Sequence, residues 1–391
     1  MADRKLFVIA SVLITIGIIS SYTFSAYTVF LYDYGEFHFL LRELIAGMLA
    51  IVLMWGLSLL DPDRWLQPIG ISLFLIFFAL MIAMYFLPSS MVTSAGGAKR
   101  WIRMPGFSLA PVEFFKIGFV YFLAWSFSRK FAEHEPKSRL LEEIKMVIPY
   151  LVVFLFVVVL IAVFQNDLGQ VMVLGLTLSF MLFFAGRSFN LFLTLIGSAM
   201  VLFVIFIFLS EHRINRILSW WAHVQNGILS LMPEFLAEKL RVENAPEPYQ
   251  VSNSLNAIHH GGLTGTGLGE GIIKLGFLSE VHTDFVMAGI AEELGFIGVF
   301  AVTLLIALLI HRIFKIANRS PKKLDYLFCL GIGLLLGFSF LINTLGISGL
   351  IPIKGLALPF LSYGGSAMVA NGIALGLVLM ISKKAYKKSP E

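Results

Sequence analysis

The segment SEVHTDFVMAGIAEELG, residues 279–295, places carboxylates at the start of a strongly apolar stretch. Carboxylates in or beside lipid are costly, so each one needs a partner or a function. Asp284 allows two interpretations. With His282 and Thr283 it could form a cap cluster that accepts the first backbone N–H groups of a helix. Alternatively, a carboxylate half-immersed in lipid headgroups is desolvated enough to act as a general base near neutral pH.

Glu292 and Glu293 follow in the same apolar stretch. On an ideal helix Glu292 lies about 12 Å deeper than Asp284 and about 80° around the axis, and Glu293 lies on the opposite face. Neither carboxylate can therefore act together with Asp284 on one substrate atom. We predict structural roles for both, each with a partner from another helix.

A second charged pair occurs in APVEFFKIG, where Glu113 and Lys116 are three residues apart. This spacing places both side chains on one face of a helix. The pair could simply neutralise itself and lower the cost of inserting the helix into a membrane. Buried charges in membrane proteins more often mark a substrate or ion site, however, and we favour a functional role.

Just upstream, KRWIR places Lys99, Arg100 and Arg103 around Trp101. Outside the membrane, this cluster is a candidate site for an anion beside an interfacial aromatic ring. The alternative is a tryptophan that anchors the chain at the interface, with cations that are only solvated.

Two glycine-containing segments complete the set of candidates. The stretch GGLTGTGLGEG, residues 261–271, could cradle a phosphate with its backbone N–H groups, but a flexible turn is the favoured interpretation. In LPFLSYGGS, Ser362 and Tyr363 precede the last apolar stretch and could pack against a neighbour or line a cavity. No zinc-type cluster, P-loop or nucleophile elbow occurs in the sequence.

The composition indicates which elements must position these residues. Of the 391 residues, 58% are hydrophobic and only 14% are charged, and the mean hydropathy is +0.87. These values exclude an ordinary soluble protein and indicate a polytopic membrane protein. The single cysteine, Cys329, rules out an internal disulfide framework. The N-terminus lacks a small-residue cleavage site, so we expect it to be a membrane span rather than a signal peptide.

A spanning helix needs about 20 apolar residues. By this criterion we predict ten spans, at 6–32, 38–60, 66–87, 107–127, 146–164, 168–185, 190–209, 284–310, 325–345 and 365–382. If both termini are cytoplasmic, 18 of the 29 Lys and Arg residues lie inside, nine lie outside and two lie within spans. This bias predicts an N-in, C-in topology. The net charge of +5 then reflects topology and anionic lipid, not nucleic acid.

Three segments break the pattern of spans: 88–106, 346–364 and 210–283. In the predicted N-in topology, all three lie on the outer side of the membrane. The last is long for a loop in a compact protein, which is typical of a functional element. Within it, the apolar run 228–240 is interrupted by charges, and we predict a helix that lies on the membrane surface. No internal repeat of 20 to 50 residues is present, which argues against a transporter built from two halves.

Several motifs occur in a characteristic order: RWI, a Glu-x-x-Lys pair, a D-L-G turn, GGL-x-G-x-GLG, HTDF followed by EELG, and GL-x-LPF-x-SYGGS. Together they resemble the SEDS family, the RodA/FtsW/SpoVE proteins of bacterial cell-wall synthesis, over nearly the whole chain. PIKGLALPFLSYGGS is more similar to the cell-division members than to the elongation members. The chain departs from the family's usual pattern at Ala110, Val112, Asn166 and Ser279, but the charged members of each motif are present.

The resemblance implies an all-α polytopic protein with ten transmembrane helices, forming a single membrane domain, 1–391, with a large outer loop, 210–283, between the seventh and eighth spans. It also implies a peptidoglycan glycosyltransferase that joins lipid II into β-1,4 glycan strands. The implied partners are lipid II, a class B penicillin-binding transpeptidase and divisome membrane proteins. The implied location is the cytoplasmic (inner) membrane, at the division septum. A lipid II flippase and a non-catalytic scaffold for a transpeptidase are the competing classes.

Asp284 matches the catalytic aspartate of the family, which implies that it is the base for the acceptor hydroxyl. An α-linked donor and a β product require inversion, with charge stabilisation for the leaving diphosphate. Candidates for binding substrate or diphosphate are Arg100, Lys116, Glu113, Lys99, His282, Ser362 and Tyr363. Secondary candidates are Asp167, Glu292, Glu293 and Lys354. A divalent cation, Mg²⁺ or Mn²⁺, is a further candidate, with Asp284 as a possible ligand, and no organic cofactor is expected.

Overall fold

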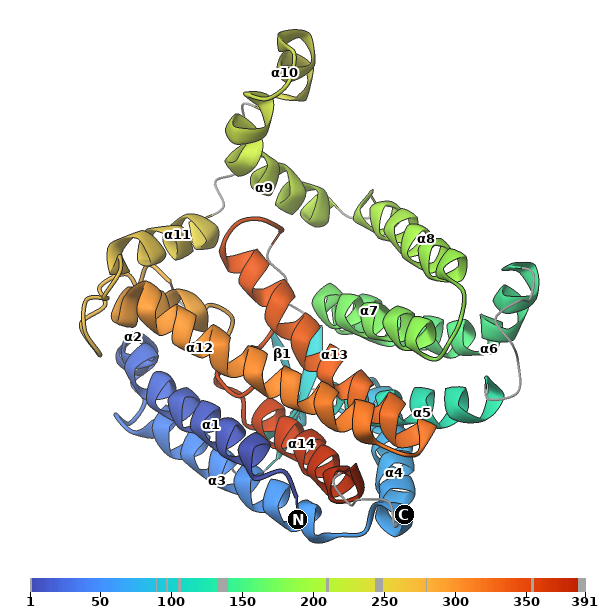
Figure 1. Ribbon diagram of the computed structural model, residues 1–391. Coiled ribbons are helices and arrows are strands. Elements are labelled where there is room, and N and C mark those ends of the chain that lie inside the picture. Colours follow the sequence, from blue (N-terminus) through green and yellow to red (C-terminus); the bar gives the residue numbers. More distant parts are fainter. Residues whose placement is uncertain are drawn as a thin grey trace.

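Figure 1 shows a bundle of long helices with a helical extension that projects from one end. This computed structural model describes residues 2–88, 90–95, 98–104, 107–131, 140–208, 211–242, 249–278, 280–352 and 355–385. The candidate Lys354 lies outside these described residues. The first helix begins and the last helix ends at the same end of the bundle (Figure 1).

The predicted apolar segments fold into long helices. These are α1 (Arg4–Phe24), α3 (His38–Leu59), α4 (Pro62–Ala83), α5 (Pro111–Lys130), α6 (Leu140–Val158) with a π-helical end (Val159–Phe164), α7 (Leu168–Phe184), α8 (Phe189–Phe208), α12 (Val286–Arg319), α13 (Lys323–Ile347) and α14 (Gly365–Ala385). Among the described residues, seven helices are long and apolar enough to cross a membrane: α1, α3, α4, α6 with its π-helical end, α12, α13 and α14. The chain is therefore a multi-pass, mainly helical membrane protein.

Helix α5 lies at the centre of the bundle, where it contacts α4, α7, α13 and α14. Most of its side chains are buried on all faces. Gly118 lets α4 approach closely, since a Cβ atom at this position would lie 2.2 Å from the backbone nitrogen of Phe74. Glu113 and Lys116 interrupt the apolar run of α5, so a centrally packed helix is less apolar than the helices that face lipid.

The segment between α4 and α5 corrects the all-α prediction. Strands β1 (Val92–Ala95), β2 (Ala98–Met104) and β3 (Phe107–Leu109) form an antiparallel sheet in the order β1-β2-β3. Ile102 pairs with Leu109 and Arg103 pairs with Ser108. The predicted span 107–127 is therefore wrong at its start, where the chain is a strand. Trp101 and Ile102 are an aromatic and a β-branched residue, and they lie between glycine-containing dipeptides, a pattern that favours a strand. A prediction from hydropathy alone does not use this pattern.

Two further predicted boundaries are wrong. The span predicted at 6–32 ends at Phe24, and a short helix α2 (Ala26–Leu31) follows a break at Ser25. The surface helix predicted at 228–240 is divided, because α9 (Glu211–Leu229) ends before Pro233 and α10 (Glu234–Leu240) begins after it. Helices α9 and α10 form the projecting extension (Figure 1).

Helix α11 (Tyr249–Gly261) returns the chain to the bundle, where it packs against α12 and α13. Trp220 on α9 donates through Nε1 to the carbonyl of Gly349 at 2.8 Å, and Ser254 on α11 donates to the carbonyl of Ile347 at 2.9 Å. The segment between α8 and α12 is thereby tied to the end of α13 and to the loop that follows it.

Candidate active site

Asp284 lies in a turn immediately before α12. The residue at the N-cap position is Phe285, and no side chain caps this helix end, so the cap hypothesis for Asp284 is wrong. The backbone of Asp284, and not its carboxylate, makes the hydrogen bonds that fix this turn. Its N–H donates to the carbonyl of Glu280 at 3.0 Å, and its carbonyl accepts from Asn343 Nδ2 of α13 at 2.8 Å. The carboxylate is therefore not used to stabilise the helix end.

The carboxylate of Asp284 faces the loop between α13 and α14. A Cβ atom added at Gly355 would lie 3.0 Å from Asp284 Oδ2, and Gly355 has a φ of +60°. Asn343 donates a second hydrogen bond, to the carbonyl of Leu356 at 2.6 Å. One amide side chain on α13 thus fixes both the turn that carries Asp284 and the loop that its carboxylate faces.

The surroundings of Asp284 make it a better base than a free carboxylate. Burial, followed by the negative charges of Glu280 and Asp167, raises the pKa of Asp284 from 3.8 to about 7, while the charge of Arg100 opposes this shift. A carboxylate with a pKa near 7 is a strong enough base to accept a proton and is still largely ionised at a slightly alkaline pH.

Arg100 connects the sheet to the turn between α6 and α7. Its Nε donates to the carbonyl of Gln165 at 2.8 Å, and its Nη2 donates to the carbonyl of Asn166 at 2.9 Å. The next residue, Asp167, caps α7 by accepting from the Gln170 N–H at 3.1 Å. Burial raises the pKa of Asp167, and the charge of Arg100 opposes this effect.

Glu113 and Lys116 continue this cluster within the bundle. Lys116 Nζ lies 2.8 Å from Glu113 Oε2, and only about a tenth of each side chain is exposed. The other carboxylate oxygen of Glu113 accepts from Gln170 Nε2 at 2.9 Å. Gln170 therefore joins the pair to the α7 end that Asp167 caps. The charges of Glu113 and Lys116 also act on the pKa of Asp167.

His282, Ser362 and Tyr363 support the turn behind Asp284. Ser362 Oγ donates to the carbonyl of Thr283, and the Tyr363 N–H donates to the carbonyl of His282 at 2.8 Å. The rings of His282 and Tyr363 pack against Phe39 of α3, with centroid distances of 5.3 and 5.0 Å. Burial lowers the pKa of His282, which favours a neutral ring. The structure thus places these three candidates where they hold the backbone beside Asp284.

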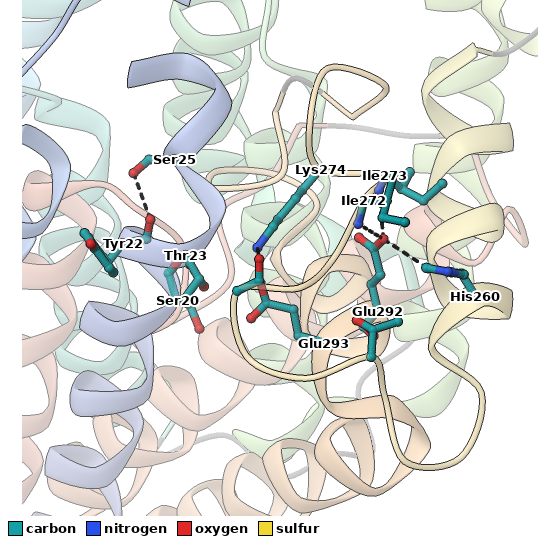
Figure 2. Close-up of polar contacts among 12 residues, drawn as sticks. Ser20, Tyr22, Thr23, Ser25, His260, Ile272, Ile273, Lys274, Glu292 and Glu293 are labelled. Carbon is teal, nitrogen blue, oxygen red and sulfur yellow. Dashed lines mark hydrogen bonds and ion pairs between the residues drawn. The ribbon is translucent and has the colours of Figure 1, made fainter. Parts of the chain in front are cut away.

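The remaining candidates lie at different places. Lys99 precedes Arg100 on β2 and is half-buried. Glu292 and Glu293 lie further along α12, where their side chains contact Ile272 and Lys274, just after the glycine-rich segment (Figure 2). His260 of α11 is a partner of Glu292, as predicted for another helix, but the partner of Glu293 is Lys274, which belongs to a turn.

Three residues of the site were missed in the sequence. Gln165 and Gln170 flank the turn that contains Asp167, and Asn343 links Asp284 to the adjacent loop. Asn343 had a usable signal, because a lone amide in a long apolar helix needs a hydrogen-bond partner. Among the described residues, no group of three or more His, Cys, Asp or Glu side chains is arranged to hold a metal ion.

The fold and the site define a multi-pass helical membrane protein in which charged residues of α5, of β2 and of the N-cap of α7 form a linked cluster. The charges of Asp167 and Arg100 in this cluster act on the carboxylate of Asp284, just before α12. Residues 3–387 match the sequence profile of the FtsW/RodA/SpoVE family, described as cell cycle proteins. The chain therefore belongs to this family.

The chain is similar to proteins named probable peptidoglycan glycosyltransferase FtsW. The relative from Helicobacter pylori is 52% identical over 382 residues, covering 97% of this chain and 98% of the relative. The relative from Haemophilus influenzae is 33% identical over 387 residues, covering 97% and 90%.

Solved structures share the fold. A chain from a peptidoglycan synthase complex superimposes with a TM-score of 0.72 at 24% identity, and the match covers 99% of both chains. RodA from Thermus thermophilus superimposes with a TM-score of 0.63 at 24% identity, covering 99% of this chain and 98% of RodA.

Proposed function

We propose that this protein is a peptidoglycan glycosyltransferase that polymerises lipid II into β-1,4 glycan strands for septal wall synthesis. The observation that carries the proposal is Asp284, whose pKa of about 7 suits a general base and whose carboxylate is not used as a helix cap. Membership of the FtsW/RodA/SpoVE family and the relatives named as glycosyltransferases support the same activity. The replacement of Asp284 described in the Discussion tests it.

The proposed reaction is one inverting displacement. The oxygen of the acceptor 4-hydroxyl forms a bond to the anomeric carbon of the donor sugar, and the bond from that carbon to the diphosphate oxygen breaks. Asp284 accepts the hydroxyl proton. Undecaprenyl diphosphate is the leaving group, and its oxygen keeps the electron pair of the broken bond. Attack on the face opposite the leaving group converts the α-linked donor into a β-linked product.

The leaving diphosphate needs positive charge. Arg100 uses two donors on backbone carbonyls, so its other N–H groups are the ones that would bind an anion. Lys116 shares its charge with Glu113, which holds the ammonium group in place. A divalent cation, Mg²⁺ or Mn²⁺, bound to the oxygens of the substrate would add charge stabilisation at the diphosphate.

The proposal includes ten spans, cytoplasmic termini and an outer location for residues 210–283, within one membrane domain. Helices α5, α7 and α8 are then the spans beyond the seven that length and hydropathy support. In a Cys329→Ser background, we expect an impermeant thiol reagent to label Leu231→Cys in intact cells and Glu142→Cys only in opened cells. Both positions are exposed. The reverse pattern would contradict the topology and the enzyme assignment that depends on it.

The proposed partner is a single-span class B transpeptidase, within a larger set of divisome proteins. We expect its span to dock on the lipid-facing surface of α12 and α13. Phe296, Ile297 and Phe300 give α12 a large apolar surface, each more than half exposed. A photo-crosslinker at Phe300 should capture the transpeptidase in cells, while one at the exposed Val52 of α3 should not. Capture at Val52 alone would show that this placement is wrong.

A further inference from the structure

Helix α12 is broken at Gly295, whose φ of 65° and ψ of −165° are not helical. The glycine-rich segment 262–267 folds into this break. Four backbone hydrogen bonds join the two elements: Thr266 N to Glu292 O, Gly267 N to Glu293 O, Phe296 N to Gly262 O and Ile297 N to Leu263 O. The backbone groups that the break leaves without helical partners are thus satisfied by the outer segment, as membrane burial requires.

The side chain of Glu292 fastens the next part of this segment. Glu292 Oε1 accepts from the N–H groups of Ile272 and Ile273 at 2.7 and 2.8 Å, and it lies 3.3 Å from Nδ1 of His260 (Figure 2). The carboxylate is almost fully buried. A Cβ atom at Gly271 would lie 2.8 Å from Glu292 Oε2, so the segment fits closely against this side chain.

Glu293 fastens the same segment through an ion pair with Lys274 (Figure 2). The two side chains are 1% and 3% exposed, and Lys274 Nζ also donates to the carbonyl of Gly269 at 2.8 Å. Burying such a pair gains little stability over apolar residues of similar size, whereas removing one partner leaves a buried charge. The pair is therefore better explained by the geometry that it fixes than by the stability that it adds.

The geometry that these contacts fix extends along the chain to Asp284, the proposed general base. The chain forms turns at 274–278 and at 280–284, and the Val281 N–H donates to the carbonyl of Leu278 at 3.3 Å, which joins the two. Asn253 of α11 donates to the carbonyl of Phe277 in the first of them at 2.9 Å. The N–H groups of Asp284 and Phe285 both donate to the carbonyl of Glu280. Asp284 is thus the end of a short folded unit whose beginning is fixed to α12 by Glu292 and Glu293.

We propose that Glu292, Glu293 and Lys274 are positioning residues for glycosyl transfer, which hold the folded unit that presents the Asp284 carboxylate to the acceptor hydroxyl. This inference rests on the proposed function. It assigns the two deep carboxylates of α12 to the reaction through Asp284 and not through contact with the substrate. A small displacement of a reacting group is enough to lower a rate by about 10- to 100-fold.

The experiment compares Lys274→Met and Glu293→Gln with a matched control, Arg312→Met. Arg312 forms an ion pair with Asp3 at the other end of α12, so its loss also removes an ion pair from this helix. We expect Lys274→Met and Glu293→Gln to lower the polymerisation rate by about 10- to 100-fold, with lipid II binding retained. Hydrogen exchange in 272–285 should rise, and in the control neither quantity should change.

The pH profile of the rate separates positioning from general destabilisation. Glu280, Asp167 and Arg100 are the charged groups that act on Asp284 in the intact site. When the unit loosens, water reaches the carboxylate, so the acid limb should move from about 7 toward 3.8. Rate loss in proportion to loss of folded protein, with an unchanged acid limb, would overturn the inference. So would faster exchange without a loss of rate.

Failure of the inference and failure of the proposed function give different results. If Asp284→Asn retains the wild-type rate, the proposed function fails and the inference falls with it. If Asp284→Asn is inactive but Lys274→Met and Glu293→Gln are as active as the wild type, only the inference fails.

Discussion

Asp284→Asn is expected to lower lipid II polymerisation by about two to four orders of magnitude. Asparagine keeps the size of the side chain and an oxygen acceptor, but it cannot take a proton near neutral pH. The backbone contacts to Glu280 and Asn343 do not involve the side chain, so they should persist. The measurement is the length and yield of glycan strands made from purified lipid II by the wild type and the variant.

The pH dependence of the wild-type rate gives a second test of the same group. Because the folded-state pKa of Asp284 is raised to about 7, its carboxylate becomes protonated as the pH falls through that value. The rate should therefore fall below about pH 7 and level off above it. The same shift means that the ionised carboxylate destabilises the fold at higher pH, since the folded state holds the proton more tightly than the unfolded state.

The stability of the Asp284→Asn variant distinguishes a general base from a helix cap. If Asp284 were only a cap, Asp284→Asn would lose about 1 kcal/mol of stability and retain most activity. For a buried base, the variant should unfold no more easily than the wild type at pH 8. A flippase would continue to move lipid II in the variant, and a scaffold would continue to bind its transpeptidase. Near-normal strands from well-folded Asp284→Asn protein would exclude the proposed mechanism.

Lys116→Met is expected to give the second largest effect, a loss of polymerisation of about two orders of magnitude. Methionine retains the length and apolar stem of lysine but removes the charge. Glu113 would then keep only Gln170 as a partner in a site where about a tenth of its side chain is exposed. We also expect a folding cost of several kcal/mol, because an unpaired carboxylate would remain buried.

The double variant Glu113→Gln/Lys116→Met separates the two effects. It removes both charges, so folding should recover, as measured by the yield and thermal midpoint of purified protein. If Lys116 stabilises the leaving diphosphate, polymerisation should stay low. Restored polymerisation would show that the pair serves only to neutralise itself. Lys322→Met is a suitable control, because its ion pair with Asp63 is about half exposed and should contribute little.

Much of the helical framework could be predicted from hydropathy, and the errors have a common cause. The span at 325–345 lies within α13, and the span at 365–382 lies within α14. Hydropathy did not distinguish the strand β3 from the helix α5 that follows it, nor α1 from the short α2. Both errors occur at the ends of apolar runs, where local backbone preference decides the structure and apolar content carries no information about it.

The sequence by itself determined that the chain is a multi-pass membrane protein, because a long apolar run in a bilayer can satisfy its backbone only as a helix. It also indicated Asp284, because a carboxylate at the edge of such a run is costly. Only the tertiary structure decided which groups surround that carboxylate. Arg100 reaches a carbonyl 65 positions away, and Asn343 reaches one 59 positions away. Such contacts depend on how whole helices pack together, which a local pattern does not encode.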